Sequence, residues 1–171
     1  MFGRIAPLLA TTATLLAQSS IGLSAGTQEP QRSAEVVVEH ADLIISSNSD
    51  DPSLEGYLVI WNGTDQSTSI TDMRSSAFEE ITFVQTVKTK GEARVVVQET
   101  LSIPAHSELL MRPGGVFLSI DPGKLALRVG EQVSLEILYA NGTSAEVAAM
   151  IKPDGAALED HHHGMPQTGR L

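Results

Sequence analysis

The chain has 171 residues and a formal charge of −10, from 11 basic and 21 acidic residues, and it has no run of Lys or Arg that could neutralise a nucleic-acid backbone. It has no cysteine, which excludes disulfide bonds and thiolate metal sites, so any soft-metal ligands must be Met or His. A chain of this length suits one domain with a single hydrophobic core.

The first 25 residues have the pattern of a secretory signal peptide. Arg4 supplies a positive charge, residues 5–17 are largely apolar, and a small residue, Ala25, precedes the expected cleavage site. The apolar stretch is shorter than the ~20 residues that span a bilayer, which favours cleavage over the alternative of a retained anchor. No cysteine follows the cleavage site, so lipid attachment is not expected there. We expect an exported protein, periplasmic or otherwise, with a disordered leader at 26–33 and no stable membrane insertion.

The next part of the chain has short apolar runs separated by Gly, Pro, Asn, Asp and Ser. This pattern predicts an all-β sandwich or barrel over residues 34–152, with almost no helix. The predicted strands are 35–40, 57–61, 68–73, 81–87, 94–99, 107–111, 116–120, 132–139 and 144–150. In the strand 132–139, apolar residues alternate with polar ones, which indicates one buried face.

The last two predicted strands meet at Asn141-Gly142, a pair that favours the two positive φ angles of a type I′ hairpin turn. A second Asn-Gly-Thr triplet begins at Asn62. Both triplets match the acceptor pattern for N-glycosylation. Because each directly follows an apolar strand, we interpret both as turns rather than glycan sites.

Three pieces of the sequence together indicate a known family, because they occur in a fixed order and at consistent distances along the chain. They are Tyr57-Leu58-Val59-Ile60 with Asn62-Gly63, Ile103-Pro104-Ala105 with Pro113-Gly114-Gly115, and Leu127-Arg128-Val129-Gly130-Glu131 before the final hairpin. On these pieces, the region 56–150 resembles the periplasmic copper chaperone family PCu(A)C. The resemblance implies a cupredoxin-like antiparallel β-sandwich of Greek-key type, with about eight or nine strands, that holds copper at one end.

Members of that family mark their copper site with histidine, ten residues, methionine, 21 residues, histidine, one residue and methionine. Laid on this chain without a gap, the spacing falls on Val84, Val95, Phe117 and Ser119. Valine and phenylalanine offer no lone pair, and a serine hydroxyl is a hard, weak ligand for Cu(I). The resemblance therefore implies the family fold with all four ligand positions substituted. We expect Val84, Val95 and Phe117 to pack as core instead, which would add to stability.

Other histidines and methionines could replace the lost donors. His106 and Met111 could form a displaced site, although nothing in their spacing compels it. For Met73, Met111 and Met150, packing in the core is favoured. For His40 and His106, a surface position or an ordinary hydrogen bond is favoured over metal binding.

The stronger metal signal follows the predicted domain, in residues 153–171, which we interpret as a flexible tail. His161, His162 and His163 are adjacent, two acidic residues precede them, and Met165 follows. Imidazole suits Cu(II), Zn(II) and Ni(II), whereas a thioether prefers Cu(I). Some members of the resembled family carry His- and Met-rich extensions at their C-termini. These four residues are the candidate metal ligands and copper is the candidate ion, with modest affinity because the tail must order. The alternative is an inert, solvated tail.

Two functions follow from these observations. The first is an exported copper chaperone-like protein of the PCu(A)C family, with a degenerate family site, that binds or delivers copper. The resemblance implies a copper-accepting partner, such as a respiratory oxidase subunit or its assembly factor. The alternative is a non-metal protein-binding adaptor that keeps the sandwich but has lost copper binding. We do not expect an enzyme, because no catalytic triad, paired carboxylate signature or phosphate loop is recognisable.

Overall fold

The computed structural model describes residues 34–45, 53–124, 126 and 128–158. Contacts divide the chain into two units, Met1–Gln31 and Arg32–Leu171, and every described residue belongs to the second unit. The expected signal peptide at 1–25 and the leader at 26–33 lie outside the described residues, as do His161, His162, His163 and Met165.

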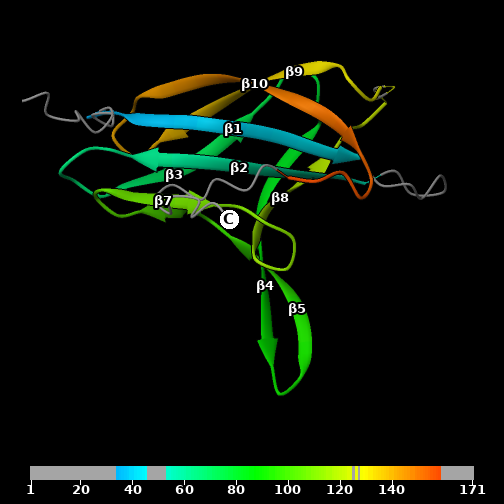
Figure 1. Ribbon diagram of the computed structural model, residues 1–171, viewed down its shortest axis with the longest axis horizontal. Coiled ribbons are helices and arrows are strands. Elements are labelled where there is room, and N and C mark those ends of the chain that lie inside the picture. The colour runs from blue at the N-terminus through cyan, green and yellow to red at the C-terminus, as the bar shows by residue number, and fades with distance from the viewer. Residues whose placement is uncertain (1–33, 46–52, 125, 127, 159–171) are drawn as a thin grey trace, which may run out of the picture. The chain divides into compact units, whose positions relative to one another are not determined.

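Ten strands form one sheet, and the described residues contain no helix, hence none that could span a bilayer (Figure 1). The strands are β1 (Val36–Ile45), β2 (Leu54–Asn62), β3 (Thr68–Arg74), β4 (Glu80–Thr89), β5 (Glu92–Gln98), β6 (Leu101–Ile103), β7 (Ser107–Leu110), β8 (Val116–Asp121), β9 (Gln132–Tyr139) and β10 (Ser144–Pro153). Their order in the sheet is β5-β4-β8-β2-β1-β10-β9-β3-β6, and β7 pairs with β2. The all-β prediction is confirmed. The pairing differs in one place, since β1 and β10 run parallel and make the sheet mixed.

Each predicted strand overlaps an observed one, but two details differ. Strand β6 was not predicted, because only Leu101 and Ile103 of its three residues are buried and so short a run gives little periodic signal. Strand β1 continues to Ile45, beyond the predicted end at residue 40. It passes through Asp42, a charged residue that interrupts the apolar pattern. Asp42 is buried and forms an ion pair with Lys152, in which the Asp42 Oδ2 lies 2.8 Å from the Lys152 Nζ.

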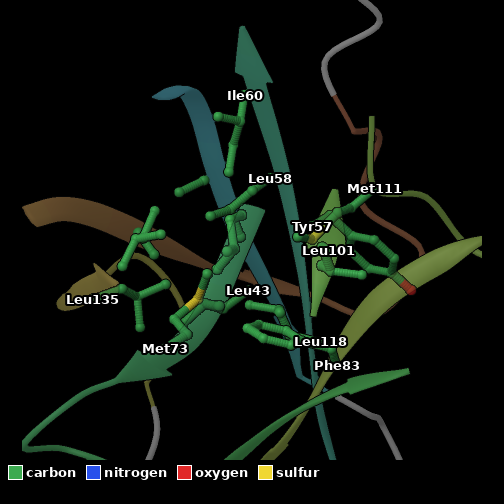
Figure 2. Close-up of a cluster of buried hydrophobic side chains, with 14 of the residues drawn as sticks. Leu43, Tyr57, Leu58, Ile60, Met73, Phe83, Leu101, Met111, Leu118 and Leu135 are labelled. Atoms are coloured by element: carbon green, nitrogen blue, oxygen red, sulfur yellow. The ribbon is translucent and has the colours of Figure 1, made fainter. Parts of the chain in front are cut away.

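The core consists of aliphatic and aromatic side chains from most strands, some of which Figure 2 shows in close-up. Strand β9 follows the predicted alternation, with Leu135 and Ile137 fully buried and Glu136 exposed. Met73 and Met111 are each 2% exposed and belong to the core cluster, which confirms their predicted packing role. The sandwich is therefore held by apolar burial, at about 25 cal/mol per Å² of surface removed from water.

The hairpin between β9 and β10 has a different turn from the one predicted. Asn141 is not among the residues with positive φ, whereas Gly142 has φ 83°. The Gly142 N–H donates to the Tyr139 carbonyl (2.9 Å) and the Tyr139 N–H to the Thr143 carbonyl (2.9 Å), which makes a three-residue loop. The Asn141 side chain accepts bonds from the Thr143 N–H and hydroxyl, at 3.0 and 2.7 Å, and these favour a loop in which Asn141 keeps a negative φ. The type I′ prediction is wrong here.

A two-residue turn with two positive φ angles occurs instead between β4 and β5. Lys90 has φ 52° and Gly91 has φ 88°, and the flanking residues Thr89 and Glu92 are paired. These features are those of a type I′ turn, whose twist matches that of the strands it joins. Figure 1 shows this β4–β5 hairpin extending away from the other strands.

Candidate metal-binding face

Strands β5, β4 and β8 lie side by side, and their register determines which side chains share a face. Val84 on β4 pairs with Phe117 on β8, and Ser119 follows two residues later on β8. Val95 on β5 pairs with Thr86, two residues after Val84. Paired residues, and residues two apart on one strand, point to the same side of a sheet. Val84, Val95, Phe117 and Ser119 therefore lie on one face, which we call the four-residue face.

The residues of this face differ widely in burial. Val84 is 4% exposed and Phe117 is half-buried, whereas Ser119 is exposed and Val95 is 62% exposed. The expectation that Val84 and Phe117 pack against the domain is confirmed, but the same expectation for Val95 is wrong. The physical reason is topological, because β5 is the last strand of the sheet and its hairpin extends beyond the elements that would cover it (Figure 1).

Aromatic packing occupies the area beside Phe117. Its ring centroid lies 6.3 Å from that of Tyr57, with the rings inclined by 34°. The Tyr57 hydroxyl donates a hydrogen bond to the Glu55 carboxylate. Burial, together with that hydrogen bond and the charge of Glu55, raises the pKa of Tyr57. None of the four residues on the face carries a soft donor atom, so the face does not fit a Cu(I) ion.

Burial of both tyrosines predicts a loss of stability in alkali. Burial also raises the pKa of Tyr139, so each phenol ionises more readily in the unfolded chain than in the folded one. Their stabilising effect is full below the unfolded pKa of about 10 and is lost as pH rises above it. We expect the free energy of unfolding to fall by up to about 1.4 kcal/mol per pH unit for each tyrosine.

Urea unfolding between pH 8 and 11 measures this effect, and absorbance at 295 nm follows tyrosinate. The control is Tyr57→Phe, which should flatten the dependence. Tyrosinate formation with a midpoint near pH 10 in the folded protein would contradict the prediction.

Tyr57, which contacts Phe117, also lines a hollow of about 270 Å³, whose lining includes His40, Asp42, Met111 and Leu158. It brings an imidazole, a carboxylate and a methionine to one region. However, Asp42 is paired with Lys152, and Met111 is almost completely buried. Within residues 34–158, as far as they are described, no three or more His, Asp or Glu side chains are placed to hold a metal ion.

The structure does not bring His106 and Met111 together. They flank the two ends of β7 (Ser107–Leu110), which separates them by about 16 Å of extended chain. His106 lines a different hollow, and its Nε2 lies 2.8 Å from Asp65 Oδ1. The displaced site considered from the sequence is therefore wrong, whereas the ordinary hydrogen-bonding role of His106 is confirmed.

Sequence reasoning did not single out the valines of β5 as a surface feature. Val95, Val96 and Val97 are 62%, 43% and 65% exposed. Three consecutive valines place apolar side chains on both faces of a strand, which suits a strand buried on both sides rather than an edge. The sequence therefore carried no signal for their exposure, which follows from the position of β5 at the end of the sheet.

Comparison with known proteins places the chain in a family. The strands and register described above define a cupredoxin-like β-domain. Residues 36–151, more than half of the chain, match the model of the family described as "lipoprotein LpqE-like", and the chain belongs to this family. None of the 171 residues is a cysteine, so this sequence has no sulfur for a thioether-linked lipid. A comparison with curated proteins finds no match.

Solved structures with a similar fold are PCuAC domains. The copper-bound PCuAC domain from PmoF2 has a TM-score of 0.57 at 15% identity, over 70% of this chain and 93% of that domain. The Cu(I) form of DR1885 from Deinococcus radiodurans has a TM-score of 0.55 at 23% identity, over 66% of this chain and 75% of that protein. Its apo form has a TM-score of 0.54 at 22% identity, over 90% of this chain and 97% of that protein. These likenesses confirm the predicted fold.

Proposed function

We propose that this protein is an exported copper-binding protein of the copper chaperone kind, whose sandwich no longer binds the ion. The observation that carries this proposal is the four-residue face. Positions with the spacing of the PCu(A)C ligands share one face, yet they hold Val84, Val95, Phe117 and Ser119. In this proposal, the face retains the strand arrangement of the PCu(A)C copper site but lacks the donor atoms that would bind the ion.

The donor atoms that remain are concentrated in the tail. Three of the chain's five histidines are His161, His162 and His163, and Met165 follows them. Neutral imidazole nitrogens would hold Cu(II), and the thioether of Met165 would favour Cu(I). Copper is the cargo in this proposal, and the tail carries it for transfer to a copper-accepting protein. A respiratory oxidase subunit or its assembly factor would be such an acceptor.

The attachment point of the tail supports this assignment. Leu158, the last described residue, packs against the core and lines the hollow that also borders Tyr57. Tyr57 in turn contacts Phe117 on the four-residue face. His161 is three residues after Leu158, a distance of at most about 10 Å along the chain. The described part of the chain thus ends next to Tyr57, the residue that contacts the four-residue face.

The prediction is that removing the tail removes copper binding. The chain from Gly26 to Leu171 should bind about one copper ion, and the same chain ending at Leu158 should bind none, because its remaining histidines are His40 and His106. Isothermal titration with Cu(II), and with Cu(I) under reducing conditions, measures both.

The matched control pairs two substitutions in the full chain. His162→Ala should weaken Cu(II) binding, whereas His106→Ala, which removes the histidine paired with Asp65, should not. Equal binding by the full and shortened chains would refute the tail assignment.

A non-metal adaptor is the second candidate function. The observation in its favour is the exposed apolar surface of β5, because contiguous exposed apolar groups on a soluble protein commonly mark an interaction site. In that case neither the full chain nor the shortened one would bind copper in the titration above.

A further inference from the structure

Strand β5 has a free edge. It is the terminal strand in the sheet order and pairs only with β4 among the described strands. Every residue from Glu92 to Val97 is exposed, on both faces of the strand. Natural edge strands are commonly shortened, charged or covered, because an open edge is a template for pairing with another strand. Three of the seven residues of β5, Val95 to Val97, are instead valines, which belong to the β-branched residues enriched in strands.

The hydrogen-bonding groups on that edge follow from the hairpin register. A two-residue turn closes on a hydrogen-bonded pair, here Thr89 and Glu92, and bonded and non-bonded pairs then alternate. Thr86 is in a non-bonded position, and its N–H indeed donates away from β5, to the Gly115 carbonyl at 2.9 Å. Val95, the partner of Thr86, therefore directs its N–H and C=O to the outer edge, as does Val97.

Charge is unevenly distributed along the hairpin. Lys88, Lys90 and Arg94 lie near its tip, and they are three of the 11 basic residues in a chain of net charge −10. Glu92 is the acidic residue at the tip and lies 3.7 Å from Arg94, so three basic residues and one acidic residue leave the tip with a net positive charge. The base of the hairpin is acidic, with Glu80 at the start of β4 and Glu99 just after β5. The hairpin thus has a net positive tip and an acidic base. A second hairpin lying antiparallel beside it would place opposite charges together at both ends.

We propose that β5 is a dimerisation strand, which pairs antiparallel with β5 of a second copy of this chain. The two-fold axis passes through Val96, so that Val96 lies opposite Val96 of the second copy. Val95 then lies opposite Val97 of the second copy, and their outward N–H and C=O groups bond in both directions. Such a contact is self-complementary and closes as a dimer.

The register is determined by two conditions. First, the outward-facing N–H and C=O groups of Val95 and Val97 must lie opposite outward-facing groups of the second copy. Because every second residue faces outward, each residue can shift its partner only in steps of two residues along the second strand. The register centred on Val96 sets all three valines against valines and Arg94 against Gln98, with no like charges opposed. Centring on Val95 instead sets Ala93 against Val97 and leaves Arg94 opposite Val96, which loses apolar pairing.

Sedimentation of the chain from Gly26 tests the dimer, independently of copper and of the tail. We expect a dimer for the parent chain and also for the chain ending at Leu158. The double substitution Val95→Lys and Val97→Lys should raise the dimer dissociation constant at least about a hundredfold, through like charges placed opposite each other. Val129→Lys is the control, since Val129 is also exposed, at 57%, but lies outside the hairpin.

A parent chain that is monomeric at all concentrations overturns the proposal, even if its edge captures a different protein. So does a Val95→Lys, Val97→Lys variant that is folded by circular dichroism and still dimeric.

Disulfide trapping tests the register without a disruptive substitution, because the chain has no cysteine of its own. Val96→Cys places two thiols at a non-bonded pair, where the Cα atoms of opposite residues are about 4.5 Å apart, within the Cα range of about 4.4–6.8 Å for disulfides. We expect rapid covalent dimer formation in mild oxidant for Val96→Cys. Val95→Cys and Val87→Cys, both at exposed positions of the hairpin, should form little. Equal trapping by all three variants, or faster trapping by Val87→Cys, contradicts the proposed pairing.

Discussion

The substitutions Val84→His, Val95→Met, Phe117→His and Ser119→Met, made together, are expected to create a Cu(I) site on the sandwich. Val84 and Phe117 are paired across β4 and β8, so their replacements would have Cβ atoms about 5 Å apart. Positions 95 and 119 are on the same face, on either side of that pair. Two imidazoles and two thioethers converging there form a soft, low-charge ligand set for Cu(I).

The expected gain is at least about three orders of magnitude in Cu(I) affinity, equivalent to about 4 kcal/mol. The experiment uses the chain ending at Leu158, so that the tail ligands do not contribute. Competition with a coloured Cu(I) chelator measures the affinity. Val84 is nearly buried, and a histidine there adds volume, but Phe117→His removes volume from the paired position, so we expect the variant to fold.

The matched control carries the same donors where they cannot converge. Histidine would replace Thr71 and Val129, and methionine would replace Leu110 and Ala148. All four positions are exposed, and no two of them are paired in the sheet. If the designed variant binds Cu(I) no more tightly than this control, the four-residue face does not correspond to the PCu(A)C ligand positions.

The substitution Asn62→Ala is expected to cost about 3 kcal/mol of the free energy of unfolding. Asn62 ends β2 and is completely buried. Its Nδ2 donates to the carbonyls of Gln66 (2.8 Å), Ile103 (3.0 Å) and Pro104 (3.0 Å). Its Oδ1 accepts from the Thr64 N–H at 3.1 Å and hydroxyl at 2.7 Å. An alanine leaves these groups without their partner in a region with little access to water, and this desolvation is the main cost.

The second Asn-Gly-Thr triplet supplies the control for this prediction. Asn141 makes the same two bonds with its threonine, but it is exposed and holds only its own turn. Asn141→Ala should therefore cost less than about 1 kcal/mol, because water replaces the lost bonds. Urea unfolding of both variants gives the comparison. Similar costs for the two substitutions would show that the bonds of Asn62 to Ile103 and Pro104 contribute little.

These two asparagines also show why the sequence predicted some features and not others. The triplet Asn-Gly-Thr correctly predicted a strand end and a turn in both places, because that signal is local. It could not distinguish the two roles. The Asn62 amide bonds to carbonyls 41 and 42 residues away, and only folding brings those groups to it.

The same distinction applies to the candidate site. Strand positions at 81–87, 94–99 and 116–120 were predictable from apolar runs, and the resemblance supplied the spacing of the four positions. The exposure of Val95 was not predictable, because valine in a strand is usually buried, and only the sheet order shows that β5 is the last strand. The placement of the type I′ turn at Lys90-Gly91 rather than Asn141-Gly142 was missed as well, since Lys90 carries no strong turn signal.

The sequence by itself determined the strand content of this protein and its inventory of metal donors. Both depend on residue type and local spacing, so the lack of donors at Val84, Val95, Phe117 and Ser119 and their concentration at His161–Met165 are visible without coordinates. Only the tertiary structure decided which side chains share a face, which asparagine is buried and which strand edge is open. Those properties depend on pairing between strands far apart in the chain, such as β1 with β10 and β4 with β8, and no local pattern records that pairing.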